Sequence, residues 1–320
     1  MIRKKLTKHD WLKSQLEIIS EIGRKVRIDG ITTEYAAYTA LKLISVHYYS
    51  EVFSQIARHP NRRLQGFDGA VYLDLFAGTG LVKLTDTNDF VGGSVPCAVM
   101  TKSGYDYCIC VEIKKDRCEI LEKRLSKILK NDEFKVINGD CNECINQVIE
   151  LIKIKFKRPI IFTVIDPEGM EIKFSTLKAL ADSFKSCDFM ISVTTSGVSR
   201  VAGKFEKGIT NVKKSLENYL DQDAHAILQQ LAEGETPQSL YQGQIEKILG
   251  KPIGDTIPIH KKGKDVAYYL LSYTRSTKAG SQYAKSLSKL KKQIEWADRT
   301  HVKNALDQIY NRAGTIDSYF

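Results

Sequence analysis

Four acidic residues of this 320-residue chain each follow a stretch that is typical of a buried strand. They are Asp74, Glu112, Asp140 and Asp166. In an open α/β sheet, nucleotide-like ligands bind at the carboxyl ends of the strands, and an ionised carboxylate has two oxygens that accept hydrogen bonds. Any one of these acids also fits a turn former or a helix N-cap. Their recurrence at successive strand ends favours a ligand site.

A tight glycine turn follows the first of these acids. The apolar run Val71–Phe76 leads directly into Ala77-Gly78-Thr79-Gly80. Glycine lets the backbone turn sharply and approach a ligand that a Cβ atom would block. The chain continues with Leu81-Val82-Lys83, so the spacing is not the dinucleotide pattern Gly-x-Gly-x-x-Gly. A Gly-x-Gly after a strand also fits an ordinary turn between a strand and a helix. The ligand contacts that we predict in this segment are Asp74, Phe76, Gly78 and Gly80.

This arrangement resembles motif I of the class I S-adenosylmethionine (SAM) methyltransferases, in which an acidic residue precedes a short Ala-Gly-x-Gly turn. The resemblance implies SAM as the cofactor and one role for each acid. Asp74 would face the methionine end, Glu112 would accept both ribose hydroxyls, and Asp140 would hold the adenine amino group. Glu112 lies further from Gly80 than the usual offset of about 20 residues, because a polar loop is expected over residues 83–93.

The segment Asp166-Pro167-Glu168-Gly169 occupies the position of motif IV, beside the transferred methyl group. Adenine amino methyltransferases carry Asp/Asn-Pro-Pro-aromatic there, and the aromatic ring stacks on the flipped base. Glu168 and Gly169 replace the second proline and the aromatic residue, which argues against adenine N6 as the target. The Asp-Pro-x-Gly form resembles that of tRNA guanine-N2 methyltransferases, where Glu168 would accept from guanine. A Pro-Gly turn after a buried strand is the simpler alternative. The predicted catalytic residues are Asp166, Pro167 and Glu168.

Strands that alternate with helices predict an α/β fold with a doubly wound, Rossmann-like class I methyltransferase sheet that ends in an antiparallel hairpin. We expect a helical N-terminal extension at 1–66, a methyltransferase domain at 67–199 and 256–296, a helical insertion at 200–255, and a tail at 297–320. The expected strands are 71–76, 107–113, 134–140, 160–165 and 188–193, with a hairpin of 256–260 and 266–274. The expected helices include 10–27, 33–57, 116–129, 144–155, 175–184 and 280–296, and one with Ser94 as its N-cap.

The chain carries a net charge of +10, with an isoelectric point near 9.1. Clustered Lys and Arg neutralise phosphates and release counterions, so this charge favours a nucleic-acid partner. A solvated, lysine-rich surface fits the same composition. Arg200, just after the fifth strand, is a candidate phosphate contact, and the basic stretches at 204–214 and 278–292 would extend the footprint.

Other classes of protein find little support in the sequence. No apolar run approaches the length of a membrane span, and the N-terminus lacks a signal-type apolar core, so we expect a soluble, cytoplasmic protein without a membrane partner. Seven cysteines, an odd number, favour reduced thiols. Cys141-Asn-Glu-Cys144 stands alone without a second pair or a nearby histidine, so no metal is expected.

The motifs together resemble the three-Cys-motif partner protein (TcmP) family, from about Lys42 to Trp296. The residues that carry the resemblance are Tyr72-Leu-Asp-Leu-Phe-Ala-Gly-Thr-Gly80, Gly93-Ser94, Val111-Glu112, Asn138-Gly-Asp140, Ile165-Asp-Pro-Glu-Gly169, Ser199-Arg200 and Tyr268-Tyr-Leu-Leu271. Family members usually have Gly-Pro-Gly at 78–80, Gly-Ser-Pro at 93–95 and Asp-Pro-Phe-Gly at 166–169, and the change to Glu168 bears on the substrate. The resemblance implies a methyltransferase-like fold and a partner protein, encoded nearby, that carries the three cysteines.

Three functions are open at this stage. The first is a SAM-dependent methyltransferase acting on an RNA or DNA base. The second is a partner or adaptor protein that keeps the methyltransferase fold without independent catalysis. The third is a small-molecule or protein methyltransferase whose positive charge has no role in substrate binding.

Overall fold

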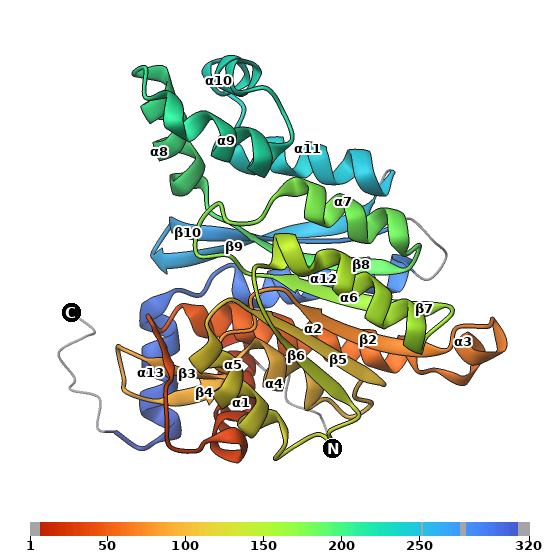
Figure 1. Cartoon of the computed structure of the whole chain (residues 1–320). Coiled ribbons are helices and arrows are strands. Elements are labelled where there is room, and N and C mark those ends of the chain that lie inside the picture. Colours follow the sequence, from red (N-terminus) through yellow and green to blue (C-terminus); the bar gives the residue numbers. More distant parts are fainter. Residues whose placement is uncertain (1–6, 251, 276–279, 313–320) are drawn as a thin grey trace.

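The computed structural model describes residues 7–250, 252–275 and 280–312. Its main element is a seven-stranded sheet with the spatial order β6-β5-β2-β7-β8-β10-β9 (Figure 1). The strands are β2 (Gly69–Asp74), β5 (Tyr107–Glu112), β6 (Phe134–Asn138), β7 (Pro159–Ile165), β8 (Cys187–Val193), β9 (Ile253–Lys262) and β10 (Asp265–Thr274). The first five strands in this order are parallel, whereas β10 runs antiparallel to β8 and pairs with β9 as a hairpin. The predicted fold class, a Rossmann-like methyltransferase sheet ending in an antiparallel hairpin, is confirmed.

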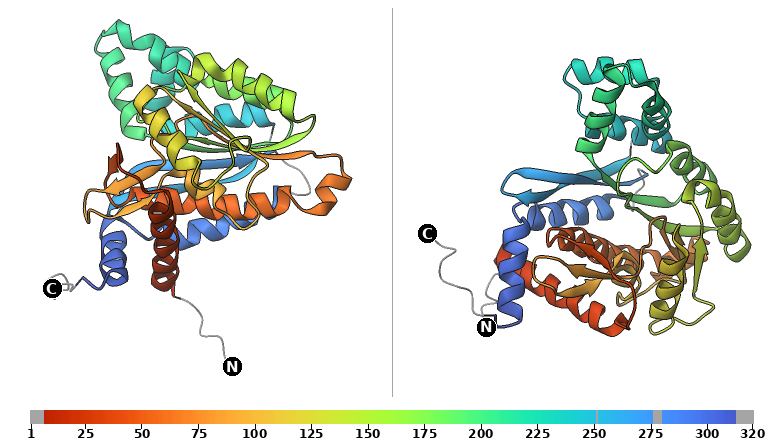
Figure 2. Two further views of the ribbon diagram at one scale, coloured as in Figure 1. Left: turned by 60° about the horizontal axis from the view of Figure 1, so that its bottom comes forward. Right: turned by 60° about the vertical axis from the view of Figure 1, so that its left-hand side comes forward.

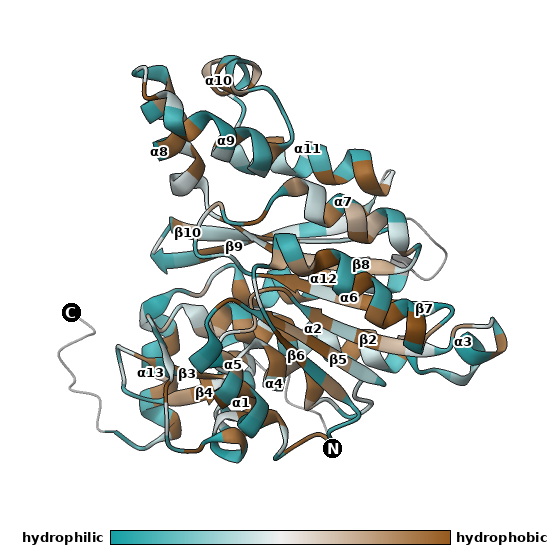
Figure 3. Ribbon diagram, viewed as in Figure 1, coloured by the Kyte–Doolittle hydropathy of each residue, from teal (hydrophilic) through white to brown (hydrophobic). Residues whose placement is uncertain are grey.

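Helices cover both faces of this sheet, which explains why every residue of β2, β7 and β8 is buried. Successive side chains of a strand point to opposite faces. In β2, Val71 and Leu73 therefore join the core under one helix layer, and Ala70 and Tyr72 join the core under the other. Figure 3 shows hydrophobic residues along the central strands and the inward helix faces. The first layer contains α6 (Cys141–Lys155) and α7 (Phe174–Ser183), and the second contains α2 (Thr39–Ala57), α4 (Ser94–Val99), α5 (Lys115–Leu125) and α12 (Gly280–Ile294).

A second, three-stranded sheet was not predicted. It consists of β1 (Thr33–Tyr35), β3 (Leu81–Leu84) and β4 (Phe90–Gly92). The helix predicted for 33–57 is thus wrong over its first residues, and the loop predicted for 83–93 is largely a hairpin. Apolar residues decide this, because Val82, Leu84 and Val91 are buried in one cluster with α1 (Lys8–Val26). Polar residues 85–89 form the hairpin turn.

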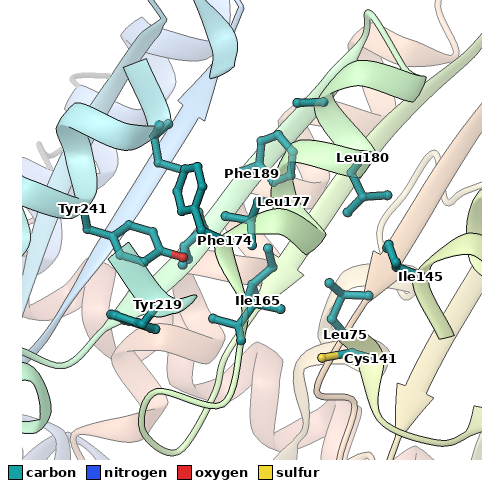
Figure 4. Packing of buried hydrophobic residues seen from close by; sticks show 14 of the residues in the cluster. Leu75, Cys141, Ile145, Ile165, Phe174, Leu177, Leu180, Phe189, Tyr219 and Tyr241 are labelled. Carbon is teal, nitrogen blue, oxygen red and sulfur yellow. The ribbon is translucent and has the colours of Figure 1, made fainter. Parts of the chain in front are cut away.

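The region predicted as a helical insertion is helical from Thr195, directly after β8. Its helices share the main core instead of forming a separate one, as Phe174, Tyr219 and Tyr241 group together beside Ile165 in Figure 4. The Tyr219 and Tyr241 ring centroids are 4.9 Å apart. The elements are α8 (Thr195–Glu206), η1 (Thr210–Val212), α9 (Lys213–Leu220), α10 (Ala224–Ala232) and α11 (Pro237–Leu249).

The two ends of the described chain lie together on the other side of the sheet. The segment predicted as a tail contains α13 (Arg299–Ile309), which packs against α1 through Val302, Ala305 and Leu306. Figure 2 shows α1 and α13 on the side of the sheet opposite the helices of the insertion. The short helix α3 (Pro60–Leu64) follows α2. Residues 1–6 of the predicted extension, 313–320 of the predicted tail and Lys278 of the basic stretch lie outside the described residues.

Helix α1 approaches the backbone of β4 closely at Gly23. A Cβ atom on Gly23 would lie 2.8 Å from both the Cα and the carbonyl carbon of Val91. These are backbone atoms of a strand in the small sheet, so they cannot give way as a flexible side chain would. The glycine therefore fixes how near α1 lies to the sheet.

We expect Gly23→Ala to lower the free energy of unfolding by about 1–3 kcal/mol, because α1 must move away from β4. The matched control is Gly203→Ala in α8, where an added Cβ meets nothing within 4 Å. There the change should stabilise the protein by about 0.5–1 kcal/mol through helix propensity alone. Urea unfolding of both variants measures the difference, and equal effects would contradict the close packing.

Candidate functional site

A pocket of about 250 Å³ opens at the carboxyl ends of β2, β5, β6 and β7. This is the edge of the sheet where the acidic residues were predicted to gather. The predicted residues that line the pocket are Phe76, Gly78, Gly80, Glu112, Asp140, Asp166 and Glu168. They come from four strand ends that are far apart in the sequence and adjacent in the sheet.

The glycine turn forms the floor of this pocket. Gly78 and Gly80 have φ angles of +61° and +74°, in the left-handed region that favours glycine. Gly93, the N-cap of α4, donates its N–H to the Gly80 carbonyl at 2.9 Å, and a Cβ on Gly93 would lie 2.8 Å from the Gly80 carbonyl carbon. The N-cap of α4 is thus Gly93 and not the predicted Ser94. A glycine is required at this position because its backbone lies against that of Gly80.

Glu112 is fixed across the turn by two backbone donors. Its Oε2 accepts from the Gly78 N–H at 3.0 Å, and its Oε1 accepts from the Lys114 N–H at 2.9 Å. The residue is 6% exposed and lines the pocket. Each carboxylate oxygen can accept a second hydrogen bond, so the side chain can receive two ligand hydroxyls without losing its own supports.

Asp140 caps α6 and keeps one oxygen free for a ligand. Its Oδ1 accepts from the backbone N–H and the Nδ2 of Asn142, at 2.8 and 2.9 Å. Within the described part of the chain, its Oδ2 has no hydrogen-bond partner. Asn142 also donates to the Glu171 carbonyl and accepts from the Lys173 N–H, which ties the loop after β7 to the end of β6. Asn142 was not among the predicted site residues.

Lys42 of α2 also belongs to this pocket, although no motif in the sequence predicts it. Its ammonium forms an ion pair with Oδ2 of Asp166, and the residue is 8% exposed. The Nζ atom lies 5.6 Å from the ring centroid of Tyr35 and 5.7 Å from that of Tyr268. Burial, together with the carboxylates of Asp166 and Glu168, raises the pKa of Tyr35 above its ordinary value. A single lysine in an otherwise largely apolar helix was the available signal.

The N-terminal segment therefore closes the pocket as well as packing on the sheet. Thr33, Tyr35, Thr39 and Lys42 all line it. Thr33 Oγ1 lies 3.2 Å from Thr79 Oγ1, which joins β1 to the glycine turn. From below, Arg124 donates its Nη1 to the Thr79 carbonyl at 2.7 Å, and burial lowers the pKa of this guanidinium to about 10.

Three predicted residues do not line the pocket. Asp74 is fully buried, where its oxygens accept from the Tyr72 hydroxyl at 2.9 Å and the Phe76 N–H at 3.0 Å. Burial raises its pKa to about 6, although these bonds and one from Ser94 favour the charged form. Asp74 thus supports the turn from beneath. Pro167 is buried, and Arg200 is exposed on α8.

No metal site is built into the part of the chain that the structure describes, since no three His, Cys, Asp or Glu side chains are grouped to hold one. All seven cysteines are free thiols, including Cys141 at the edge of the pocket. Among the described helices, none is both long and apolar enough to cross a bilayer.

Comparisons with known proteins are distant. No protein family and no curated protein matches the chain, so the resemblance to the TcmP family stays a prediction.

Three similar solved structures illustrate the distance. The protein LPL1258 from Legionella pneumophila is 13% identical, covering 78% of this chain and 94% of its own, with a TM-score of 0.44. An O-methyltransferase from Bacillus cereus in complex with SAH is 10% identical, covering 86% and 94%, with a TM-score of 0.39. Trm1 from Pyrococcus horikoshii with S-adenosyl-L-methionine is 11% identical, covering 78% and 58%, with a TM-score of 0.37.

Asp74 makes stability depend on pH in a way that Asp74→Asn removes. The pKa of Asp74 is about 6 in the folded protein and 3.8 ordinarily. The contribution of its protonated form to the free energy of unfolding is therefore fully present below about pH 4 and is lost as the pH rises through about 6. As the pH rises from about 4 to about 7, we expect the free energy of unfolding of Asp74→Asn to increase relative to that of the wild type by up to about 3 kcal/mol. Urea unfolding measures this, with the exposed Asp182→Asn as the control for lost charge. A difference that does not vary with pH would contradict the assignment.

Proposed function

We propose that this chain is a SAM-dependent methyltransferase that acts on a base of RNA or DNA. The observation that carries the proposal is the set of side chains around one pocket at the carboxyl edge of a methyltransferase-type sheet. Glu112 and Asp140 lie beside the glycine turn, and Asp166 with its partner Lys42 lies in the same pocket.

The residues at one end of the pocket fit the cofactor. Gly78, with a positive φ and no side chain, leaves room for a ligand against the turn. Glu112 has acceptor capacity left for two ribose hydroxyls, and the unpartnered Oδ2 of Asp140 suits an adenine amino group. When bound, SAM supplies a methyl group on a positively charged sulfur. The protein's part is to hold the methyl group and the acceptor in line.

The residues around Asp166 fit a planar acceptor that carries an amino group. The Lys42 ammonium holds Oδ2 of Asp166, which orients the carboxylate and leaves Oδ1 free of hydrogen bonds from the described residues. In this proposal Oδ1 accepts a hydrogen bond from the target amine, and the Tyr35 ring offers a flat surface for the base. Glu168, exposed at the pocket mouth, takes up the proton that the amine loses after methyl transfer.

The nucleic-acid part of the proposal is supported by charge. The net charge of +10 favours a polyanion, and the exposed Arg200 extends from α8, which begins at the same edge of the sheet as the pocket. The proposal includes a cytoplasmic location, which suits the free thiols. The proposal also includes a protein partner, which the resemblance to the TcmP family implies. An adaptor without catalysis remains the rival hypothesis, and the binding measurement below separates it from the enzyme.

Isothermal titration of SAM and S-adenosylhomocysteine tests the cofactor site. We expect micromolar binding to the wild type, and at least about a tenfold loss in Glu112→Ala, because charge-assisted hydrogen bonds to the ribose disappear. Glu150→Ala, which removes an exposed carboxylate on α6, is the matched control and should bind normally. No binding to the wild type would reject the enzyme and bring the adaptor forward.

Methyl transfer from labelled SAM to total cellular RNA tests the acceptor end. We expect Lys42→Met to keep its SAM affinity and lose about 100-fold in methyl incorporation, because Asp166 is no longer oriented. The flexible methionine side chain fills the space of the lysine stem, and Asp166→Asn gives a second test of the same pair. The exposed Lys123→Met serves as the control. Normal incorporation by both pair variants would remove Lys42 and Asp166 from the reaction.

A further inference from the structure

A second and larger cavity, of about 840 Å³, lies at the opposite edge of the sheet. It is bounded by α3 and the end of α2, by the beginnings of β7 and β8, and by the end of β10 with α12. In Figures 1 and 2, α3 lies at the end of the molecule away from the β3–β4 hairpin. The cavity is therefore separate from the pocket that contains Glu112 and Asp166, and no predicted function uses it.

Three basic side chains converge on this cavity from three segments. They are Arg62 of α3, Lys185 before β8, and Arg275 after β10. Within the described residues, none of them forms an ion pair. Arg62 donates to Oε1 of Gln65 at 3.2 Å, and Arg275 donates to the Ala181 carbonyl. Nε of Arg275 is buried and has no hydrogen-bond partner among the described residues, so this donor lacks an acceptor.

Asp188, the only carboxylate among the described lining residues, offsets the charge of these three cations only in part. Asp188 is 5% exposed, and its Oδ2 accepts from the Tyr49 hydroxyl at 2.8 Å. Among the described residues, Asp188 forms no ion pair with Arg62, Lys185 or Arg275, although the Arg62 guanidinium acts on its charge through space. Like charges that face one cavity repel each other, and an anion placed between them relieves the repulsion.

The cavity also has aromatic walls, which a simple anion would not require. Phe67 and Tyr283 line it, and the Phe67 ring centroid lies 4.9 Å from the Arg158 guanidinium and 5.8 Å from that of Arg62. Tyr283 is only 5% exposed, so the half-buried Phe67 is the ring with more surface for a ligand. Rings of this kind stack on a nucleobase, and guanidinium groups bind phosphate with two donors at once. Buried Asp188 adds an acceptor for the polar edge of a base.

We propose that this cavity is a second ligand site, which binds a nucleotide through its phosphate and its base. The nucleotide is either a free nucleoside monophosphate or one unit of an RNA strand, since both present the same chemistry. The site does not depend on the proposed methyltransferase activity, because it lies at the amino ends of the parallel strands and shares no lining residue with the pocket at the other edge.

The test uses the full chain saturated with S-adenosylhomocysteine, with Glu112→Ala in parallel so that binding at the first pocket is not counted. Uridine monophosphate is the free-nucleotide probe, uridine is its control without phosphate, and a short fluorescein-labelled single-stranded RNA is the strand probe. The variants are Arg62→Gln and Lys185→Gln. Arg62 is half-buried and donates a hydrogen bond to Gln65, and Lys185 is exposed. Lys303→Gln on α13 removes the same charge elsewhere.

We expect one of the two phosphate probes to bind the wild type more tightly than uridine binds. Arg62→Gln and Lys185→Gln should each weaken that binding at least about tenfold, and Lys303→Gln should leave it unchanged. If the two variants lose affinity for uridine monophosphate, the ligand is a free nucleotide. If they lose affinity only for the RNA, the ligand is a nucleotide within a strand. The proposal is overturned if neither probe binds, or if both variants bind as Lys303→Gln does. Either outcome leaves the SAM titration with Glu112→Ala to be judged separately.

Discussion

The ion pair between Lys42 and Asp166 is the contact on which the arrangement of the site depends. Removing two charges from water is costly, and attraction in a poorly hydrated interior compensates only when the geometry is good. Lys42 is 8% exposed, whereas the Asp166 side chain keeps 23% of its surface in water. Loss of one partner of a fully buried ion pair lowers stability by about 3–5 kcal/mol. Because Asp166 is partly hydrated, the loss of Lys42 or Asp166 should lower stability by less than this. The pair thus holds α2 to the edge of the sheet while leaving the carboxylate usable.

This contact also explains why the N-terminal segment belongs to the site. Once Lys42 is fixed at Asp166, the residues before it lie over the pocket, and β1 completes the small sheet with β3. Thr33 then meets Thr79 in the glycine turn. The turn is held from above by Thr33, from the side by Glu112, and from beneath by Asp74 through the Phe76 N–H. These supports come from three separate segments, so the backbone of the turn is fixed before a ligand arrives.

The sequence was informative wherever local patterns decide structure. Apolar runs located the strands of the main sheet, and an acid after a strand located Glu112, Asp140 and Asp166. It failed where partners are distant in the chain. Lys42 and Asp166 are 124 residues apart, and β1 has only three residues, so neither carries a local signal. Asp74 shows a third reason: alternation along β2 puts its side chain on the same face as Tyr72, away from the pocket.

The hairpin that ends the sheet has a consequence for self-association. Strand β9 is the outermost strand, and a long outer strand presents unpaired backbone groups that can recruit the strand of another molecule. Pro258, in the middle of β9, has no N–H to donate, and the exposed Lys261 and Lys262 place two like charges at its end. A second copy approaching this edge would meet a missing donor and then electrostatic repulsion. The β9 edge of the sheet is in this way protected against edge-to-edge aggregation.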